Sequence, residues 1–486
     1  MTRPGIVVTP TDSAIPRTTS TDSGTWFVAG LTEQGTLEPT LVKSLNQYVD
    51  VFGARVAYGA LYDALDVFFR EGGARAIVGR VVGPDAVASS AVLYDAAGST
   101  PADVALDVSA KNPGAWGDEL NVEVTAGDAV DEFKILVSHD TLGLLETSPS
   151  LLDRDAAVAW ADTTSAYIDI ALGASNEDPR VQGPTGLAGG DDDRANITDD
   201  EWAATLALFT RDLGAGQVSM PGRTTLQAHS DTLAHAAAFA RTALLDAPDT
   251  GVADDLIDAA TDIRALGSVA RYGGLFAPYA TVPGLTPSTT RSVGYAAVQA
   301  GLMARNDGAG LSVNQPAAGE LGVSRYALAV SQSFTEAERE SLNDAGVNLA
   351  RLLYGSIRTY GYRTLADPLA DANWINLANT RLLNDITSKA YAIGERYMFR
   401  QLDARKVTIS QWGGDLRAML MPYFEAGSLY GESPDEAFSV DVGDTINTPV
   451  TIANNELRAA LSVRMSAMAE LVTIEIIKVP TNEEIA

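Results

Sequence analysis

The sequence predicts a multidomain protein of the mixed α/β and α+β class. Its 486 residues suggest about three or four domains, at roughly 100–200 residues per domain. Strand-like and helix-like segments alternate near the N-terminus and again after residue 186, which is typical of α/β domains. Between them, residues 89–185 form short runs of alternating polar and apolar residues, which is typical of a β-sandwich.

An extended arm is expected over residues 1–25, because a short β-like run at Ile6–Val8 is followed by a Thr- and Ser-rich stretch without helical periodicity. The next segment, 26–88, has the pattern of a compact α/β unit. It begins with a strand at Trp26–Ala29, continues with a helix at Leu61–Arg70 and ends with a strand at Ala76–Val82.

The β-sandwich predicted over residues 89–185 rests on runs such as Asp103–Val108 and Leu120–Val124. In both runs polar and apolar residues alternate, and Gly, Asn and Pro residues form turns between them. The stretch Gly183–Asp193 is rich in Gly, Pro and Asp, so we interpret it as the loop that ends this domain.

A second α/β domain is predicted over residues 186–345, where helices at Glu201–Leu213 and Ser230–Asp246 alternate with short apolar runs. The remaining segment, 346–486, contains the clearest helix. Apolar residues recur there at spacings of three or four from Ile375 to Tyr397, which places them on one face for core packing. Asp371 is a candidate N-terminal cap of this helix.

The chain closes with a strand-like run, Val472–Val479, in which β-branched and polar residues alternate until Pro480. A strand-like segment is therefore expected near each terminus.

Composition excludes several classes of protein. The chain has 34 Lys and Arg against 63 Asp and Glu, and a net charge of −29 argues against direct nucleic-acid binding. The absence of cysteine excludes disulfides, thiolate metal sites and cysteine nucleophiles. No signal-peptide pattern and no apolar run of about 18 residues occurs, so we predict a soluble protein made in a cytoplasm, without membrane insertion.

Charge is distributed unevenly along the chain. Residues 85–205 carry 24 acidic and 5 basic residues, whereas residues 347–417 carry 10 basic and 6 acidic ones. The second segment could meet an acidic partner, although scattered charges commonly just face water.

Motifs of common enzymes are absent or incomplete. No Gly-Lys pair occurs, which excludes a P-loop, and Gly308–Val313 lacks the third glycine of a dinucleotide-binding loop. The triplet Asp249-Thr250-Gly251 is found in aspartic proteases and resembles the acidic corner of subtilisin-like proteases. No second such triplet occurs, and all three histidines precede Asp249. A loop or helix-boundary role is therefore favoured, and no catalytic residues are assigned.

No metal or cofactor site is predicted. Asp191–Asp193 and Asp199–Glu201 could gather oxygen ligands around calcium, but they lack the EF-hand spacing, which favours a solvated acidic loop. His229 and His235 are six residues apart, which does not place two ligands on one helix face, so we interpret both as structural.

A set of segments along the chain forms a distinctive combination. In the N-terminal half they are Arg3-Pro4-Gly5-Ile6-Val7-Val8, Phe68-Phe69-Arg70-Glu71-Gly72-Gly73 continuing to Val81, and Lys111-Asn112-Pro113-Gly114-Ala115-Trp116-Gly117-Asp118 continuing to Leu120. In the C-terminal part they are Gly346–Asn348, Tyr360–Leu365, Trp374–Phe399 and Glu470–Ile476. Together they cover nearly the whole chain, and the combination resembles the tail sheath proteins of contractile bacteriophages and related contractile injection systems.

The resemblance implies an inner domain built from two separate parts, 26–88 and 346–486. The β-sandwich (89–185) and an α/β domain (186–345) would be inserted between them. In this family the α/β domain resembles the subtilisin fold without its protease triad, so the resemblance implies a protein that is not an enzyme.

In proteins of this family, terminal arms pair with the sheets of neighbouring subunits. The resemblance places these inter-subunit arms at Pro4, Gly5, Ile6, Val7 and Val8, and at Val472, Thr473, Ile474, Glu475, Ile476 and Ile477. The implied function is that of a structural subunit, which forms stacked rings in a helical sheath around a tail tube and contracts to drive the tube through the target cell envelope. Baseplate and tail terminator proteins are further implied partners. The sheath would belong to a virion assembled in the bacterial host cytoplasm.

The basic segment 347–417 supplies candidates for contact with an acidic tube surface. They are Arg381, Lys389, Arg396 and Arg400, which lie on or near one helix. Two alternatives remain: the sheath of a non-phage system, pyocin-like or of type VI secretion, and, from a different class, a subtilisin-like hydrolase that uses Asp249.

Overall fold

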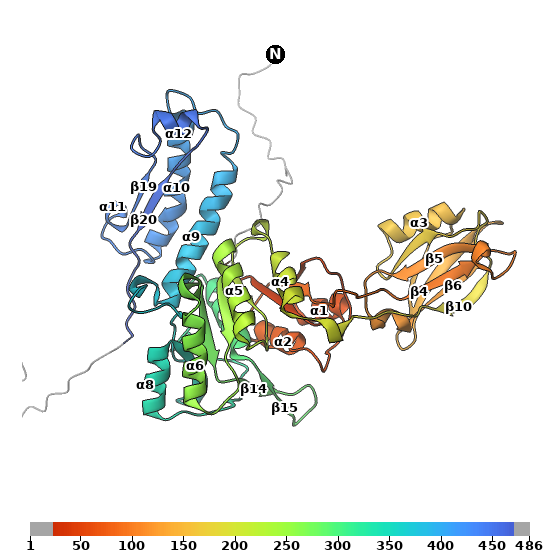
Figure 1. The fold of residues 1–486 in the computed structure, drawn as a ribbon, viewed down its shortest axis with the longest axis horizontal. Helices are drawn as coiled ribbons and strands as arrows, with labels where there is room; N and C mark the ends of the chain where they lie inside the picture. The colour runs from red at the N-terminus through yellow and green to blue at the C-terminus, as the bar shows by residue number, and fades with distance from the viewer. Residues whose placement is uncertain (1–22, 471–486) are drawn as a thin grey trace, which may run out of the picture. The chain divides into compact units, whose positions relative to one another are not determined.

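The computed structural model describes residues 23–470 (Figure 1). The chain divides into two compact units, the first ending at Ser388 and the second beginning at Lys389. The boundary falls inside helix α9, Leu377–Glu395. Several sheets and many helices occur in the described residues, which confirms the predicted mixed α/β class.

The first unit is built on a sheet of eight strands in the order β18-β17-β13-β12-β11-β1-β3-β2. Every neighbouring pair from β17 to β3 is parallel, whereas the edge strands β2 and β18 are antiparallel to their neighbours. The strands are β1 Trp26–Gly30, β2 Thr40–Val42, β3 Ala76–Arg80, β11 Gln217–Ser219, β12 Thr242–Asp246, β13 Gly273–Ala277, β17 Val347–Leu353 and β18 Ser356–Thr359.

The central strands consist of residues that suit a parallel sheet. All residues of β1, β3, β12 and β13 are buried, and their sequences are nearly continuous apolar runs. Such runs are typical of parallel strands because helices cover both faces of the sheet. Phe27, Phe209 and Leu275 belong to the core that the sheet shares with these helices.

Several of the covering helices begin or end at residues with clear capping chemistry. Thr198 with Glu201 and Thr335 with Glu338 form capping boxes at the starts of α4 and α8. Gly346 adopts a left-handed conformation (φ +90°) that ends α8. The helices are α1 Leu45–Phe52, α2 Leu61–Glu71, α4 Asp199–Ala207, α5 Leu226–Phe239, α6 Ala253–Arg264, α7 Tyr295–Gly308 and α8 Glu336–Ala345.

The sheet joins segments that the sequence-based division placed in different domains. β1 pairs with β11 on one side and with β3 on the other, so that Trp26 lies opposite both Gln217 and Ala76. The parts of 26–88 and 186–345 that form strands β1, β3 and β11 to β13 therefore lie in one layer. Strand pairing between residues so distant in the chain has no local signal in a single sequence.

The helix expected over residues 230–246 is two elements. Helix α5 ends at Phe239, Ala240 adopts a left-handed conformation (φ +54°), and the buried strand β12 begins at Thr242. A short apolar run that follows a helix directly cannot be distinguished from the helix by periodicity alone.

The stretch predicted as a β-sandwich forms two antiparallel sheets around one core. One sheet has the order β10-β6-β7-β8 and the other β4-β5-β9. Alternate residues such as Val122, Val124 and Ile135 point into the shared core, which α3 also contacts. The elements are β4 Ser90–Tyr94, β5 Val104–Ala110, β6 Leu120–Ala126, β7 Phe133–His139, β8 Gly143–Thr147, α3 Arg154–Thr163, β9 Ile168–Leu172 and β10 Gln182–Gly186.

A neck joins this two-sheet part to the eight-stranded sheet. Its two chain segments are hydrogen-bonded to each other, from Gly83 N to Asp192 O (2.8 Å) and in both directions between Val87 and Asp191. The buried Arg80 guanidinium at the end of β3 pairs with Asp192 (2.6 Å) and also donates to Gly35 O (2.7 Å). The neck is therefore fixed by an ion pair as well as by backbone bonds.

The second unit contains the end of α9 and a compact helix–hairpin arrangement. Its elements are α10 Val407–Glu425, α11 Pro434–Ala437, β19 Phe438–Asp441, α12 Pro449–Ala453 and β20 Ala460–Val463.

A small three-stranded sheet in the first unit completes the fold, with β14 Ala280–Pro283, β15 Thr290–Val293 and β16 Ala329–Val330.

The N-terminus of α9 differs from the sequence-based expectation. Asp371 precedes a separate short 3₁₀ turn, Ala372–Trp374, and makes no side-chain capping bond there. Asn376 accepts instead from the backbone N–H of Ala378 (2.9 Å) through its Oδ1 atom. Over residues 23–470, no helix has the length and hydrophobicity needed to span a membrane.

Candidate functional site

The second unit carries a two-stranded sheet with open edges. β19 and β20 are antiparallel, with Phe438 opposite Val463 and Asp441 opposite Ala460. No other strand within residues 23–470 pairs with either of them. Each outer edge of a two-stranded sheet leaves a row of backbone N–H and C=O groups that is not paired with another strand. Both edges are therefore candidate acceptors for a further strand.

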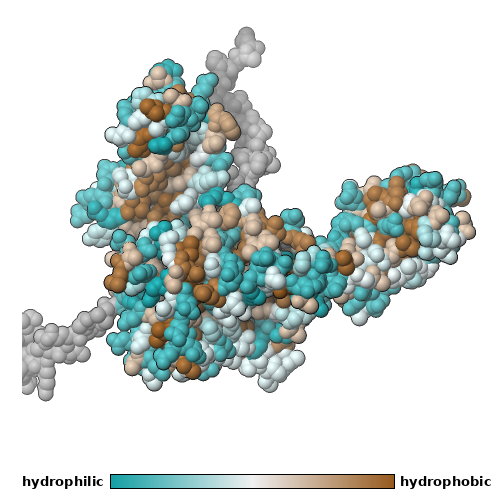
Figure 2. Space-filling view, in the orientation of Figure 1, coloured by the Kyte–Doolittle hydropathy of each residue, from teal (hydrophilic) through white to brown (hydrophobic). Residues whose placement is uncertain are grey.

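The apolar face of this sheet packs against α10. Phe438 is buried, and Val440 and Leu461 are partly buried in a cluster around Leu416. Further apolar residues of the second unit are buried outside this cluster, among them Ile409, Leu420 and Leu429. Figure 2 shows hydrophobic atoms gathered on the visible face of the part that contains β19, β20 and α10.

Both predicted arms fall outside the described residues. The N-terminal arm, Pro4–Val8, precedes Ser23, and the C-terminal arm, Val472–Ile477, follows Glu470. Their pairing remains a prediction.

The structure removes Arg381 from the set of residues that could contact a tube. Its side chain is 3% exposed and forms an ion pair with Asp307, with 3.0 Å between Nη1 and Oδ1. The guanidinium also donates to Val313 O (3.1 Å) and Ser23 O (3.2 Å). The sequence gives no sign that Arg381 is buried, because its partner Asp307 is 74 residues earlier in the chain.

The other three candidates lie in the second unit, with different environments. Lys389 is partly buried, donates to the Tyr423 hydroxyl (2.7 Å) and lies over the Tyr423 ring. Arg396 and Arg400 are exposed, and the Arg400 guanidinium lies 4.8 Å from the centre of the Tyr397 ring. Arg396 and Arg400 therefore present the most accessible positive charge of this set.

An exposed aromatic residue lies next to these arginines. Phe399 is 100% exposed in the loop between α9 and α10, and it has a left-handed backbone conformation (φ +60°). Met398 beside it is 57% exposed. Sequence analysis missed this pair, because an apolar residue at the end of an apolar helical stripe looks like a core residue.

The residues of the hydrolase alternative have unrelated positions and partners. Asp249 is exposed and accepts from the Ser331 hydroxyl (2.7 Å). The buried His229 ring contacts the backbone carbonyl of Asp246 through Nε2 (3.0 Å), and the His235 ring lies against Arg241 Nη1 (2.9 Å). These contacts support the structural interpretation of both histidines.

Both buried histidines make stability depend on pH. Burial lowers the pKa of His235 to about 3, with a further contribution from Arg241, and lowers the pKa of His229 to about 4. The unfolded chain would take up these protons near pH 6.5, before the folded chain does, so protonation favours unfolding as the pH falls from about 6.5 towards 3. Burial raises the pKa of Asp246, which acts in the opposite sense.

The variant His235→Gln is expected to lose less stability between pH 6.5 and 4 than the unaltered chain. The slope of its unfolding free energy against pH should be smaller by the equivalent of up to about one bound proton. Urea unfolding at a series of pH values measures this difference, and the comparison cancels the contribution of Asp246. His139→Gln is the matched control, because the His139 side chain is partly exposed beside Glu119 in the two-sheet part, whereas His235 is buried. An identical slope in the His235 variant would contradict the assignment.

Some residues of the two acidic clusters make structural contacts, whereas others are exposed to solvent. Asp192 is buried against Arg80 and Arg194, and Glu201 caps its own helix. Within the described part of the chain, no group of three His, Asp or Glu residues is arranged to hold a metal ion.

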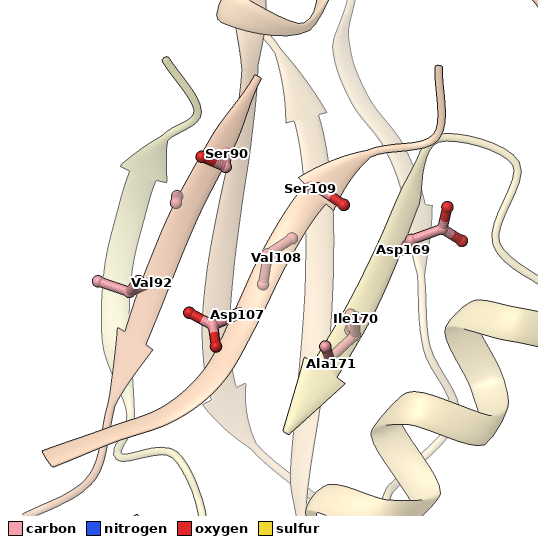
Figure 3. Close-up of a pocket in the computed structure, with 9 residues that line it drawn as sticks. Ser90, Val92, Asp107, Val108, Ser109, Asp169, Ile170 and Ala171 are labelled. Carbon is pink, nitrogen blue, oxygen red and sulfur yellow. The ribbon is translucent and has the colours of Figure 1, made fainter. Parts of the chain in front are cut away.

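A shallow groove runs over the outer face of the β4-β5-β9 sheet (Figure 3). Its volume is about 460 Å³, and short side chains on adjacent strands form its floor. Ser109 lies opposite Asp169 in the register, and Asp107 lies opposite Ala171. Lys111 already pairs with Asp169 (2.7 Å), so the groove lacks the convergent free polar groups of a ligand site.

The sequence matches no protein-family model, and no curated protein matches it. Solved structures, by contrast, share its fold along most of the chain. The sheath tail protein of Listeria innocua has a TM-score of 0.62 at 12% identity and covers 88% of this chain and 90% of its own. The sheath tail protein of Desulfitobacterium hafniense has a TM-score of 0.55 at 13% identity, with 90% and 93% covered.

The helical sheath of the anti-feeding prophage in its contracted state is similar over almost the full length. Its TM-score is 0.57 at 15% identity, and the likeness covers 98% of this chain and 99% of that one. At these identities the likeness establishes the fold, so the chain has the fold of these sheath proteins.

Proposed function

We propose that this chain is the structural subunit of a contractile tail sheath. It polymerises helically around an inner tail tube and contracts to drive the tube through the target cell envelope. The observation that carries the proposal is the shared fold over 98% of the chain with a protein that forms a helical sheath. A fold by itself does not fix a function, but a likeness that includes every domain is stronger than one confined to a common fold.

The open edges of β19 and β20 support a specific way of linking subunits. Strand addition to an exposed sheet edge provides backbone hydrogen bonds between chains. We assign the arms Pro4–Val8 and Val472–Ile477 to this role in neighbouring subunits, because both are rich in β-branched residues, which favour strands. Contacts between different surfaces of identical subunits generate helical assemblies.

The likeness to sheath proteins supports the remaining parts of the proposal. Stacked rings would form the sheath, with tail tube, baseplate and tail terminator proteins as partners. The particle would be a virion tail assembled in the bacterial host cytoplasm, and contraction would proceed by repacking of interfaces without a nucleotide. The parallel sheet with helices on both faces would correspond to the non-catalytic, subtilisin-like part, although it also includes strands from residues 26–80 and 347–359.

Arg396 and Arg400 are the positions where we expect contact with an acidic tube surface. The double variant Arg396→Gln/Arg400→Gln should reduce co-sedimentation with tubes several-fold, with the largest loss at low salt, where exposed charges are least screened. Arg417→Gln/Arg458→Gln is the matched control, since both of these arginines are partly exposed in the same unit and pair with Asp435 and Glu456. Equal co-sedimentation of both variants would reject the contact.

Negative-stain electron microscopy of the purified chain, alone and mixed with its tube protein, tests the function directly. Hollow, striated tubes are the expected result. Monodisperse monomers under both conditions would reject the sheath, and hydrolysis assays with Asp249→Asn would then test the alternative. A non-phage injection system, pyocin-like or of type VI secretion, is the second candidate function within the same fold. Identification of the delivered cargo distinguishes it from a phage.

A further inference from the structure

A buried ion pair holds the chain where it enters the fold. Ser23, the first described residue, donates from its hydroxyl to Asp307 Oδ2 (2.7 Å). Its carbonyl oxygen accepts from Arg381 Nη2 (3.2 Å). Asp307 and Arg381 also form a bidentate ion pair with each other, and both side chains are less than a tenth exposed. Ser23 is thus bonded to both members of the pair.

The position of Asp307 does not favour the stability of its own helix, α7. It lies in the last turn of α7, where the helix dipole disfavours a negative charge. Burying both charges also costs free energy, and apolar pairs of similar size often serve stability equally well. A role in positioning neighbouring groups accounts better for this pair than a role in stabilising the fold.

The pair connects three elements that are distant in sequence. Arg381 belongs to α9, and Asn384 on the same helix donates to Arg241 O (2.7 Å) directly before β12. Gln217, the first residue of β11, donates weakly to Ser23 O (3.5 Å). The start of the chain is therefore tied to the end of α7, to α9 and to the central sheet.

We propose that the Asp307–Arg381 pair anchors the N-terminal segment, so that load on residues 1–22 passes into α7 and α9 instead of separating β1 from the sheet. Without the anchor, tension would pass to the backbone bonds at the start of β1, where Thr25 O accepts from Gln217 N (2.9 Å) and Trp26 N donates to Arg75 O (3.1 Å). It would then open the bonds of β1 one after another. The mechanical role rests on the proposed function, because it requires an arm that links subunits. The anchoring itself does not.

Hydrogen exchange on the full chain tests the anchor. In the double variant Asp307→Leu/Arg381→Met, we expect amide exchange across Ser23–Val28 to rise about tenfold or more, because local opening no longer has to break the contacts of Ser23. Exchange in α5 and β12 should stay within about twofold. Arg80→Met/Asp192→Leu is the matched control, since it removes a buried pair at the neck and should leave Ser23–Val28 unchanged.

Two results would overturn the anchor: unchanged exchange at Ser23–Val28, or an equal rise throughout the first unit, which indicates a purely structural pair. If the double variant does not fold, Ser23→Ala gives the same decision, because it removes one donor and keeps the ion pair. We expect it to raise local exchange about threefold.

Where the unaltered chain forms sheaths, sheaths of the double variant should break into short pieces on contraction. Intact contracted sheaths would reject the load-bearing role alone, and a chain that forms no sheaths would reject the proposed function instead.

Discussion

Deletion of residues 1–10 is expected to abolish helical polymerisation without lowering the thermal stability of the chain. The hydrogen bonds and core contacts described above lie within residues 23–470, so the deletion changes none of the residues that make them. It does remove Pro4–Val8, the segment that we assign to an open edge of the β19–β20 sheet. Each lost arm would cost several backbone hydrogen bonds per subunit, at about 0.5–1.5 kcal/mol apiece, and a lattice repeats this loss at every contact.

Sedimentation velocity and negative-stain microscopy measure the result, and a melting curve checks the fold. A triple variant with Ile6, Val7 and Val8 replaced by Gly should behave like the deletion, because glycine disfavours a strand while the length of the arm is kept. Ile6→Val/Val8→Ile is the matched control and should polymerise normally. Normal tubes from the deletion would show that subunits associate through other surfaces.

Elements that depend on local patterns could be predicted from the sequence. The helix expected at Leu61–Arg70 is α2, and the strands expected at Trp26–Ala29 and Ala76–Val82 are β1 and β3 with ends shifted by one or two residues. Their signals are contained in a few neighbouring residues: a row of apolar side chains, and Gly72 with φ +112° at the end of α2.

Features that depend on distant residues could not be predicted in this way. The pairing of β1 with β11 joins residues separated by about 190 positions, so the division into domains did not reveal the shared sheet. The burial of Arg381 depends on Asp307, and the exposure of Phe399 depends on where α9 ends. In each case the deciding contact, or its absence among the described residues, is set by tertiary packing.

The segment Phe68–Val81, one of those that carried the family resemblance, has a physical explanation in the structure. Glu71 is fully buried at the end of α2. Gly72 provides the left-handed turn, and a Cβ atom on Gly73 would lie 2.3 Å from the Phe68 ring. Close packing and one buried carboxylate thus explain this segment as a feature that stabilises the fold.

Glu71 connects α2 to a loop more than 250 residues later. Its carboxylate accepts from the backbone N–H groups of Arg325 (3.0 Å) and Tyr326 (3.0 Å) and from the Ser324 hydroxyl. Arg305 on α7 lies 3.4 Å away and supplies the opposite charge. The carboxylate therefore accepts several hydrogen bonds that tie this loop to α2.

Glu71→Ala is accordingly expected to lower the free energy of unfolding of the first unit by about 3–5 kcal/mol, because it leaves the largely buried Arg305 without its partner charge. Urea unfolding followed by circular dichroism measures the loss. Glu71→Gln is the matched control: it keeps an oxygen for the backbone donors but removes the charge, so it should cost clearly less than Glu71→Ala. Glu336→Ala, which removes an exposed carboxylate near Arg339 and Arg351, should change stability by less than about 1 kcal/mol. Similar losses for Glu71→Ala and Glu336→Ala would mean that the buried carboxylate contributes no more than a surface ion pair, and the explanation given for the segment would fail with it.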